Sequence, residues 1–263
     1  MDRCIIDNDS PNNLTINKDS YIIISSEVQS KNIEFNILDC KVTIIDMASC
    51  SNKNLNLKNC EANFIEIVNN KKNRKVLLNN DKSIVEYNII DLFDQDIDYY
   101  LEGNCVGEGS NSIVNIASIC YKNKNKNYVI NTSNSNANTS NEINCFGIVK
   151  DKSILNYDVT SFIEKGAKQS LVRQSSNILL FDECSLGKNN PILLIEENDV
   201  KASHGSSIGK IDDDTMFYLC SRGLSIAEAT NLICLGKVEY LMKKIEDKKI
   251  KESLTNHFKE RMS

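Results

Sequence analysis

The stretch NIEFNILDCKVTII (residues 32–45) shows the pattern that decides the fold. Apolar and polar residues alternate over 32–38, and after a short interruption a second run rich in β-branched residues begins. Alternation with a period of two is typical of short β-strands with one buried face. Residues 21–24 and 63–68 have the same character. We therefore predict short strands from about residue 20 to residue 210.

Cysteines recur at a regular spacing within this region. Cys40, Cys50 and Cys60 are ten residues apart, each just before a new strand. Regular short strands without Asn-Gly or Asp-Gly hairpin turns favour a solenoid over a meander. In a parallel β-helix with coils of about 20 residues, Cys40 and Cys60 would stack about 4.8 Å apart. We interpret the three cysteines as a buried ladder of small apolar side chains and not as a metal site.

The turns must be built without much proline or glycine. The chain has only 2 Pro and 10 Gly, so we expect Asn to supply many turns, since it tolerates the left-handed region. Residues 122–142 are rich in Asn, Lys and Ser and resemble low-complexity sequence. A disordered loop is one interpretation, but we favour a turn followed by a polar coil of the solenoid. Arg173 and Gln174 are expected on a face of the solenoid.

Composition excludes several classes of protein. The 263 residues carry a net charge of −5, which argues against general nucleic-acid binding. No run of about 18 apolar residues is present, so no membrane span is expected. The first residues lack the pattern of a secretory signal, so a cytoplasmic location with reduced cysteines is predicted. No pair of the ten cysteines has C-x-x-C spacing.

The pattern becomes helical after residue 211. Asp212 can cap a first helix, Ser225 and Glu228 form a capping box for a second, and a third covers about 247–261. We expect a β-helix core over 1–211 and a helical subdomain over 212–263. The helices are too apolar to float free, so they should pack on the solenoid end, on a partner, or on both. The expected inner positions of the second helix are Ala229, Leu232, Ile233, Val238, Leu241 and Ile245, whereas His257 is expected at the surface.

Two residues stand out chemically near this junction. His204 lies in VKASHGSSIGKIDDD (residues 200–214), among small residues that let other groups approach the ring. Cys184 follows two acids, Asp182 and Glu183, and strand alternation would point both acids away from the thiol. Thiolate and imidazole are competent iron ligands, and an accessible cysteine can carry sulfur as a persulfide. Glu196 or Glu197 could add a carboxylate ligand.

These residues carry a family resemblance. ENDVKASHGSSIGKID (197–212), followed by MFYL (216–219) and SRGLS (221–225), resembles the C-terminal signature of SufD. NILLFDEC (177–184) resembles the SufB segment that carries that subunit's functional cysteine. SufB and SufD are paralogous subunits of the SUF iron–sulfur cluster assembly complex. The resemblance is specific from about residue 165 to 245 and implies a right-handed parallel β-helix with a C-terminal helical part that docks the ABC-type ATPase SufC.

The resemblance implies a role for particular residues. Cys184 corresponds to the SufB-like position and His204 to the SufD-like position, so the pair would hold a transient, nascent iron–sulfur cluster and accept sulfur. Having both in one chain resembles the minimal single-type form of the system, sometimes called SmsB, which implies a homodimer. Their spacing in sequence is about one predicted coil, so they could meet within one chain or across two. The ATPase would contact the helical part, at Met216, Phe217, Tyr218 and Arg222.

Three functions are compatible with the sequence. The leading hypothesis is a non-enzymatic scaffold that works with the ATPase, a sulfur donor and acceptor proteins, because the chain has no P-loop of its own. The second is a β-helix enzyme, such as a polysaccharide lyase or an acyltransferase, that uses His204 as a base. The third is a purely structural solenoid, against which the apolar C-terminal helices argue.

Overall fold

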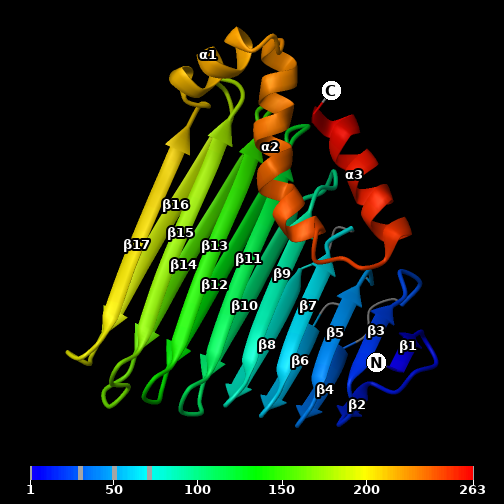
Figure 1. Ribbon diagram of the computed structural model, residues 1–263, viewed down its shortest axis with the longest axis vertical. Coiled ribbons are helices and arrows are strands. Elements are labelled where there is room, and N and C mark those ends of the chain that lie inside the picture. The colour runs from blue at the N-terminus through cyan, green and yellow to red at the C-terminus, as the bar shows by residue number, and fades with distance from the viewer. Residues whose placement is uncertain (1, 29–31, 49–51, 70–72, 263) are drawn as a thin grey trace.

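The computed structural model describes residues 2–28, 32–48, 52–69 and 73–262. Two parallel sheets lie face to face and three helices follow them (Figure 1). The odd-numbered strands form a nine-stranded sheet: β1 (Asp2–Ile6), β3 (Ser20–Ile24), β5 (Lys41–Asp46), β7 (Glu61–Ile67), β9 (Ile84–Asp91), β11 (Asn111–Cys120), β13 (Ser140–Val149), β15 (Leu171–Leu180) and β17 (Lys201–Gly209). The even-numbered strands form an eight-stranded sheet: β2 (Asn13–Ile16), β4 (Asn32–Leu38), β6 (Asn52–Lys58), β8 (Arg74–Asp81), β10 (Ile97–Cys105), β12 (Asn125–Asn134), β14 (Ile154–Ile163) and β16 (Leu186–Ile195). The predicted parallel β-helix is confirmed.

The coils lengthen along the chain. Lys41 is in register with Glu61, so one coil has the predicted length here and Cys40 stacks with Cys60. Gln174, by contrast, is in register with His204, which makes the last coil about half as long again. The predicted coil length is therefore right for the N-terminal half and wrong for the C-terminal half, where the strands themselves are longer. Cys50 lies outside the described residues.

Alternate residues of both sheets fill the space between them. The inner layer is mostly Ile, Val, Leu and Tyr, and Cys40 and Cys60 belong to it as expected. It also holds charges that the sequence pattern did not reveal. Lys53 Nζ lies 2.7 Å from Asp46 Oδ2 and 2.8 Å from Glu66 Oε2, and Arg74 pairs with Glu66 at 2.8 Å. Buried charges are tolerated only when they are paired in this way.

Asparagine ladders run along the outer faces. On each face the side-chain Nδ2 of one Asn donates to the Oδ1 of the Asn one coil earlier. One ladder is Asn63, Asn88, Asn115 and Asn144, and the other is Asn13, Asn36, Asn56, Asn79 and Asn104. The Asn-rich segment 122–142 forms β12, a turn and the start of β13, as predicted for a polar coil.

The corners use the left-handed backbone region, but not mainly through Asn. Among the described residues, positive φ angles occur at three Asn and at six other non-glycine residues: Asn59, Asn123, Asn138, Asp39, Asp151, Lys82, Lys122, Lys152 and Gln169. At such corners backbone groups bond to the next coil, as when Asn123 N donates to Asp151 O at 2.9 Å. These bonds between coils offset the cost of the left-handed conformation.

The helices are α1 (Asp213–Ser221), α2 (Ile226–Met242) and α3 (Lys248–Met262). Asp212 caps α1, and Ser225 and Glu228 form the predicted capping box of α2. α2 and α3 pack on the outer face of the nine-stranded sheet and not on the solenoid end (Figure 1). Of the expected inner positions, Ala229, Val238 and Leu241 of α2 are buried, and so is Ile245 just beyond its end, whereas Leu232 is 53% exposed. His257, which was expected at the surface, is half-buried, because its ring stacks on Phe93 with centroids 4.2 Å apart.

Candidate functional site

Cys184 lies in the turn between β15 and β16 and is exposed. Asp182 begins the turn: its Oδ1 accepts from Cys184 N at 2.9 Å, and its Oδ2 accepts from Ser185 Oγ at 2.7 Å. These hydrogen bonds hold the pKa of Asp182 below its ordinary value. The alternation argument for the two acids does not apply, since the segment is a turn and not a strand. The thiol is therefore carried on a short turn anchored by a carboxylate.

His204 lies in β17, at the open edge of the nine-stranded sheet. It is in register with Gln174, which is buried between the sheets and donates to Ser161 Oγ at 2.8 Å. Residues in register on parallel strands share a face, so His204 points toward the inside of the solenoid. It is nevertheless exposed, because it belongs to the last coil. The expectation that Gln174 lies on a face of the solenoid is wrong, because its side chain is inside.

The structure does not bring Cys184 and His204 together within this chain. His204 lies beside Gln174, six residues before β15 ends at Leu180, whereas Cys184 lies beyond that end of the strand. At about 3.3 Å per residue, the stretch from Gln174 to Leu180 corresponds to about 20 Å along the strand. The expected stacking of the two residues on adjacent coils fails because the coil here is longer than predicted.

The last coil leaves two strand edges open. β16 and β17 are the terminal strands of their sheets, and β17 lies at the left edge of Figure 1. The edge for pairing with a second chain was expected near residues 175–200. β15 is paired on both sides, so of that range only β16 is an edge strand, and β17 is the edge strand of the other sheet. Apolar side chains are exposed here, among them Ile195 (46%) and Ile208 (42%). Gly187 has no room for a Cβ, which would lie 2.9 Å from Ile178 and 3.1 Å from Ile208.

Most of the other cysteines are buried. Burial raises the pKa of Cys105 to about 11 and that of Cys120, Cys145 and Cys234 to about 12. A buried thiol with so high a pKa is a poor nucleophile and a poor metal ligand. Cys184 differs, because it is exposed at the open end of the solenoid.

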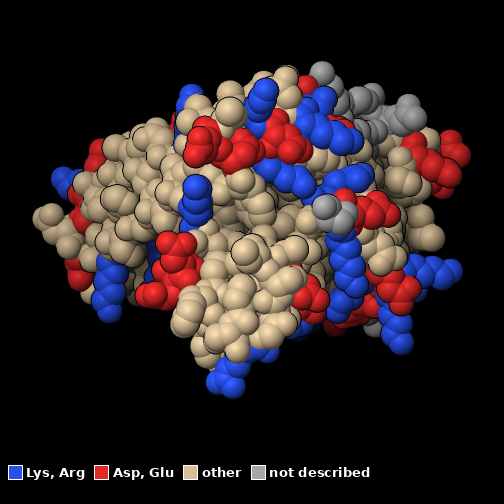
Figure 2. All heavy atoms as spheres, turned by 90° about the horizontal axis from the view of Figure 1, so that it is seen from above, with Lys and Arg blue, Asp and Glu red and all other residues tan. Residues whose placement is uncertain are grey.

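The predicted partner-binding residues lie on α1 and at its C-terminal cap, Arg222. Phe217 and Tyr218 are 76% and 56% exposed, Met216 is half-buried, and the Arg222 guanidinium lies 5.3 Å from the centre of the Tyr218 ring. α1 buries no residue of its own. The end of the molecule that carries α1 faces the viewer in Figure 2, and much of that face lacks charged side chains.

Glu197 is already engaged by the backbone. Its carboxylate accepts from the backbone N–H groups of Asp199 at 3.3 Å, Gly166 at 3.1 Å and Asn198 at 2.9 Å, which lowers its pKa. Among the residues described here, no three His, Cys, Asp or Glu side chains gather into a metal site.

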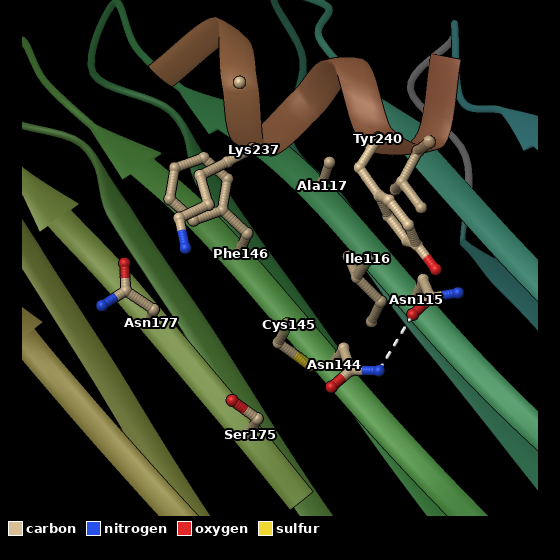
Figure 3. Close-up of a pocket in the computed structure, with 12 residues that line it drawn as sticks. Asn115, Ile116, Ala117, Asn144, Cys145, Phe146, Ser175, Asn177, Lys237 and Tyr240 are labelled. Atoms are coloured by element: carbon tan, nitrogen blue, oxygen red, sulfur yellow. Dashed lines mark hydrogen bonds between the residues drawn. The ribbon is translucent and has the colours of Figure 1, made fainter. Parts of the chain in front are cut away.

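A groove that sequence reasoning missed lies between α2 and the nine-stranded sheet (Figure 3). It encloses about 330 Å³. Asn115 and Asn144 form part of its floor and are joined by a hydrogen bond of 3.0 Å, while Lys237 and Tyr240 of α2 form a wall. In the sequence, the only indication of this groove is that an Asn recurs once per coil at the positions that form its floor. The groove contains neither Cys184 nor His204.

The chain is thus a parallel β-solenoid with an exposed thiol in the turn between β15 and β16 and an imidazole on its last strand, β17. The family described as "SUF system FeS cluster assembly, SufBD core domain" matches residues 16–237. The chain belongs to this family, and the predicted membership is confirmed.

Individual relatives match a shorter part. SufD of Bacillus subtilis is 34% identical over 110 residues, which is 42% of this chain and 25% of the relative. SufD of Escherichia coli is 29% identical over 115 residues, covering 44% and 27%. The SufBD family protein PH1385 of Pyrococcus horikoshii is 36% identical over 104 residues, covering 38% and 23%. The matches thus span about a quarter of each relative. No helix in the described residues is long and apolar enough to cross a membrane.

Proposed function

We propose that this protein is a scaffold on which nascent iron–sulfur clusters are built in a SUF-like complex, with Cys184 and His204 as ligands. Its family is one of iron–sulfur cluster assembly proteins. The observation that carries the proposal is the position of the two residues: both are exposed on the last coil. A thiolate and an imidazole form a mixed ligand set suited to iron. The cluster is the cargo, so an incomplete thiolate set helps its release.

The scaffold acts as a homodimer in this proposal. β16 and β17 present unpaired backbone groups and apolar side chains, which favour pairing with another chain. A two-fold arrangement supplies each site with residues from both copies. Since Cys184 and His204 lie at different levels of one chain, we propose that Cys184 of one copy faces His204 of the other.

The proposed partners are a SufC-type ATPase, a sulfur donor and cluster-accepting proteins, in the cytoplasm. Exposed aromatic residues such as Phe217 and Tyr218 are typical anchors of a protein–protein interface. Catalysis of ATP hydrolysis is assigned to the partner, and the scaffold itself is not proposed as an enzyme.

The site is tested by anaerobic reconstitution with iron and sulfide, read by visible absorbance. Cys184→Ser and His204→Ala should each lose most of the cluster absorbance and keep the parent's melting temperature, since both side chains are exposed. The buried Cys60→Ser is the matched control, because it should lower the melting temperature without a specific loss of iron. Parent-like clusters in both site variants would show that the assignment is wrong.

Docking of the ATPase is tested with point variants. Deletion after residue 211 is unsuitable, because it also removes α2 and α3, which cover the apolar outer face of the sheet. Phe217→Ala and Tyr218→Ala should weaken co-purification with a SufC-type ATPase at least tenfold, as expected for aromatic anchors that become buried in the interface. Tyr240→Ala, on α2 and 60% exposed, is the control. Equal binding by all three variants would contradict docking at α1.

A further inference from the structure

The turn that carries Cys184 is built differently from the same corner in the two preceding coils. The earlier corners comprise residues 121–124 and 150–153. Each contains two consecutive residues in the left-handed region, Lys122 and Asn123 in one and Asp151 and Lys152 in the other. Within 181–185, all of which the structure describes, no residue has a positive φ.

The last corner is longer by one residue. Val149 is in register with Leu180 at the start of the corner, and Ile154 is in register with Leu186 at its end. The corner between β13 and β14 therefore has the residues 150–153, and the corner between β15 and β16 has the residues 181–185. The additional residue falls in the turn that contains Cys184. A longer turn without left-handed residues needs another way to hold its backbone.

The Asp182 carboxylate provides that hold. Oδ1 accepts from Cys184 N at 2.9 Å, which closes a side-chain-to-backbone turn. Oδ2 accepts from Ser185 Oγ and from Asp151 N, both at 2.7 Å, which ties the turn to its own buried end and to the corner of the preceding coil. Glu183, the other acid beside the thiol, is exposed.

We propose that Asp182 is a positioning residue for Cys184. The hydrogen bonds of its carboxylate hold this turn, whereas the earlier corners are shaped by left-handed residues, and they fix the direction in which the Cys184 side chain projects from the solenoid. This inference rests on the proposed role of Cys184 in cluster assembly. It concerns how the chain presents the thiol, and not whether the thiol binds iron.

The anchor itself is tested by amide hydrogen exchange, which does not depend on iron. Asp182→Ala should accelerate exchange of the Cys184 and Asp151 amides by about fivefold or more, as expected for one lost hydrogen bond each. Asp182→Asn keeps one acceptor oxygen, so it should restore protection at Cys184 but not at Asp151. Glu183→Gln should change neither amide. Unchanged exchange in Asp182→Ala would refute the anchor.

The positioning role is tested by reconstitution of the same variants with iron and sulfide. Asp182→Ala should lose at least half of the visible cluster absorbance, while Asp182→Asn and Glu183→Gln stay close to the parent. If Cys184→Ser loses the cluster but Asp182→Ala forms it like the parent, the positioning role is refuted. If Cys184→Ser itself forms a parent-like cluster, the proposed role of Cys184 as a ligand fails, whatever the exchange data show.

Discussion

At the scale of single residues, the solenoid interior is held by a few buried charges. Lys126 Nζ lies 2.7 Å from Asp91 Oδ1, the Tyr128 hydroxyl donates to Asp91 Oδ2 at 2.5 Å, and both members of the ion pair are fully buried. Tyr128 also stacks with Tyr99, with ring centroids 5.8 Å apart. Lys126 comes from the run KNKNKN (residues 122–127), whose composition indicates a solvated segment. A residue's type alone does not show which of several lysines faces inward.

We expect Lys126→Met to lower the free energy of unfolding by about 3–5 kcal/mol, because it leaves the Asp91 carboxylate buried without its cation. Lys122→Met is the matched control from the same run. Its side chain is 59% exposed and pairs with Asp94 at 2.9 Å, so its loss should cost less than about 1 kcal/mol. Urea unfolding measures both. Equal costs would show that the buried pair contributes no more than a surface pair.

At the scale of elements, α3 is docked on the sheet partly through a histidine. His257 stacks on Phe93, and burial, followed by the nearby Arg261 charge, lowers its pKa from 6.5, against the opposing effects of Glu260 and of a hydrogen bond with the Leu92 backbone. Within the part of the chain that the structure describes, Nε2 is buried without a hydrogen-bond partner. The folded protein therefore favours the neutral ring.

A lowered histidine pKa makes stability depend on pH in a defined direction. The unfolded chain binds a proton near pH 6.5 and the folded chain only at lower pH, so the contribution is complete above about pH 6.5 and falls as the pH drops below it. The melting temperature should therefore decrease between pH 7.5 and pH 5.5. His257→Phe should reduce this decrease, whereas His204→Gln, which changes the only other histidine, should not. The same decrease in all three proteins would contradict this role of His257.

At the scale of the whole molecule, the outer face of the nine-stranded sheet is covered by helices, whereas the last coil of the solenoid is not. α2 and α3 cover the outer face of the nine-stranded sheet, and Tyr21, Ile45 and Ile119 lie beneath the helices' apolar layer. The last coil has no such cover, and its inner-face residues, including His204 and Ile208, are exposed. An open strand edge with apolar residues favours association with a second chain.

We therefore expect light scattering to give about twice the chain mass of 29.6 kDa. Ile195→Lys places a charge on the open last coil and should yield monomers. Ile84→Lys changes an isoleucine of similar exposure (58% against 46%) far from that coil and should leave the dimer intact. A monomeric parent at all concentrations, with the ATPase present, would rule the homodimer out.

Local structure and family membership follow from the amino-acid sequence alone. Alternation with period two predicts the strands, Ser225 and Glu228 predict the start of α2, and the motif around His204 identifies the SufB/SufD family, because each signal depends only on residues close in the chain. Which strands face each other across the core, and how far each coil advances, depends on the folded molecule. The register of β17 on β15 depends on the lengths of β16 and of the two corners that flank it. The coil that joins Gln174 to His204 is longer than the one that joins Lys41 to Glu61. Because of this greater length, Cys184 and His204 lie apart, although their spacing in sequence suggested one coil of the solenoid.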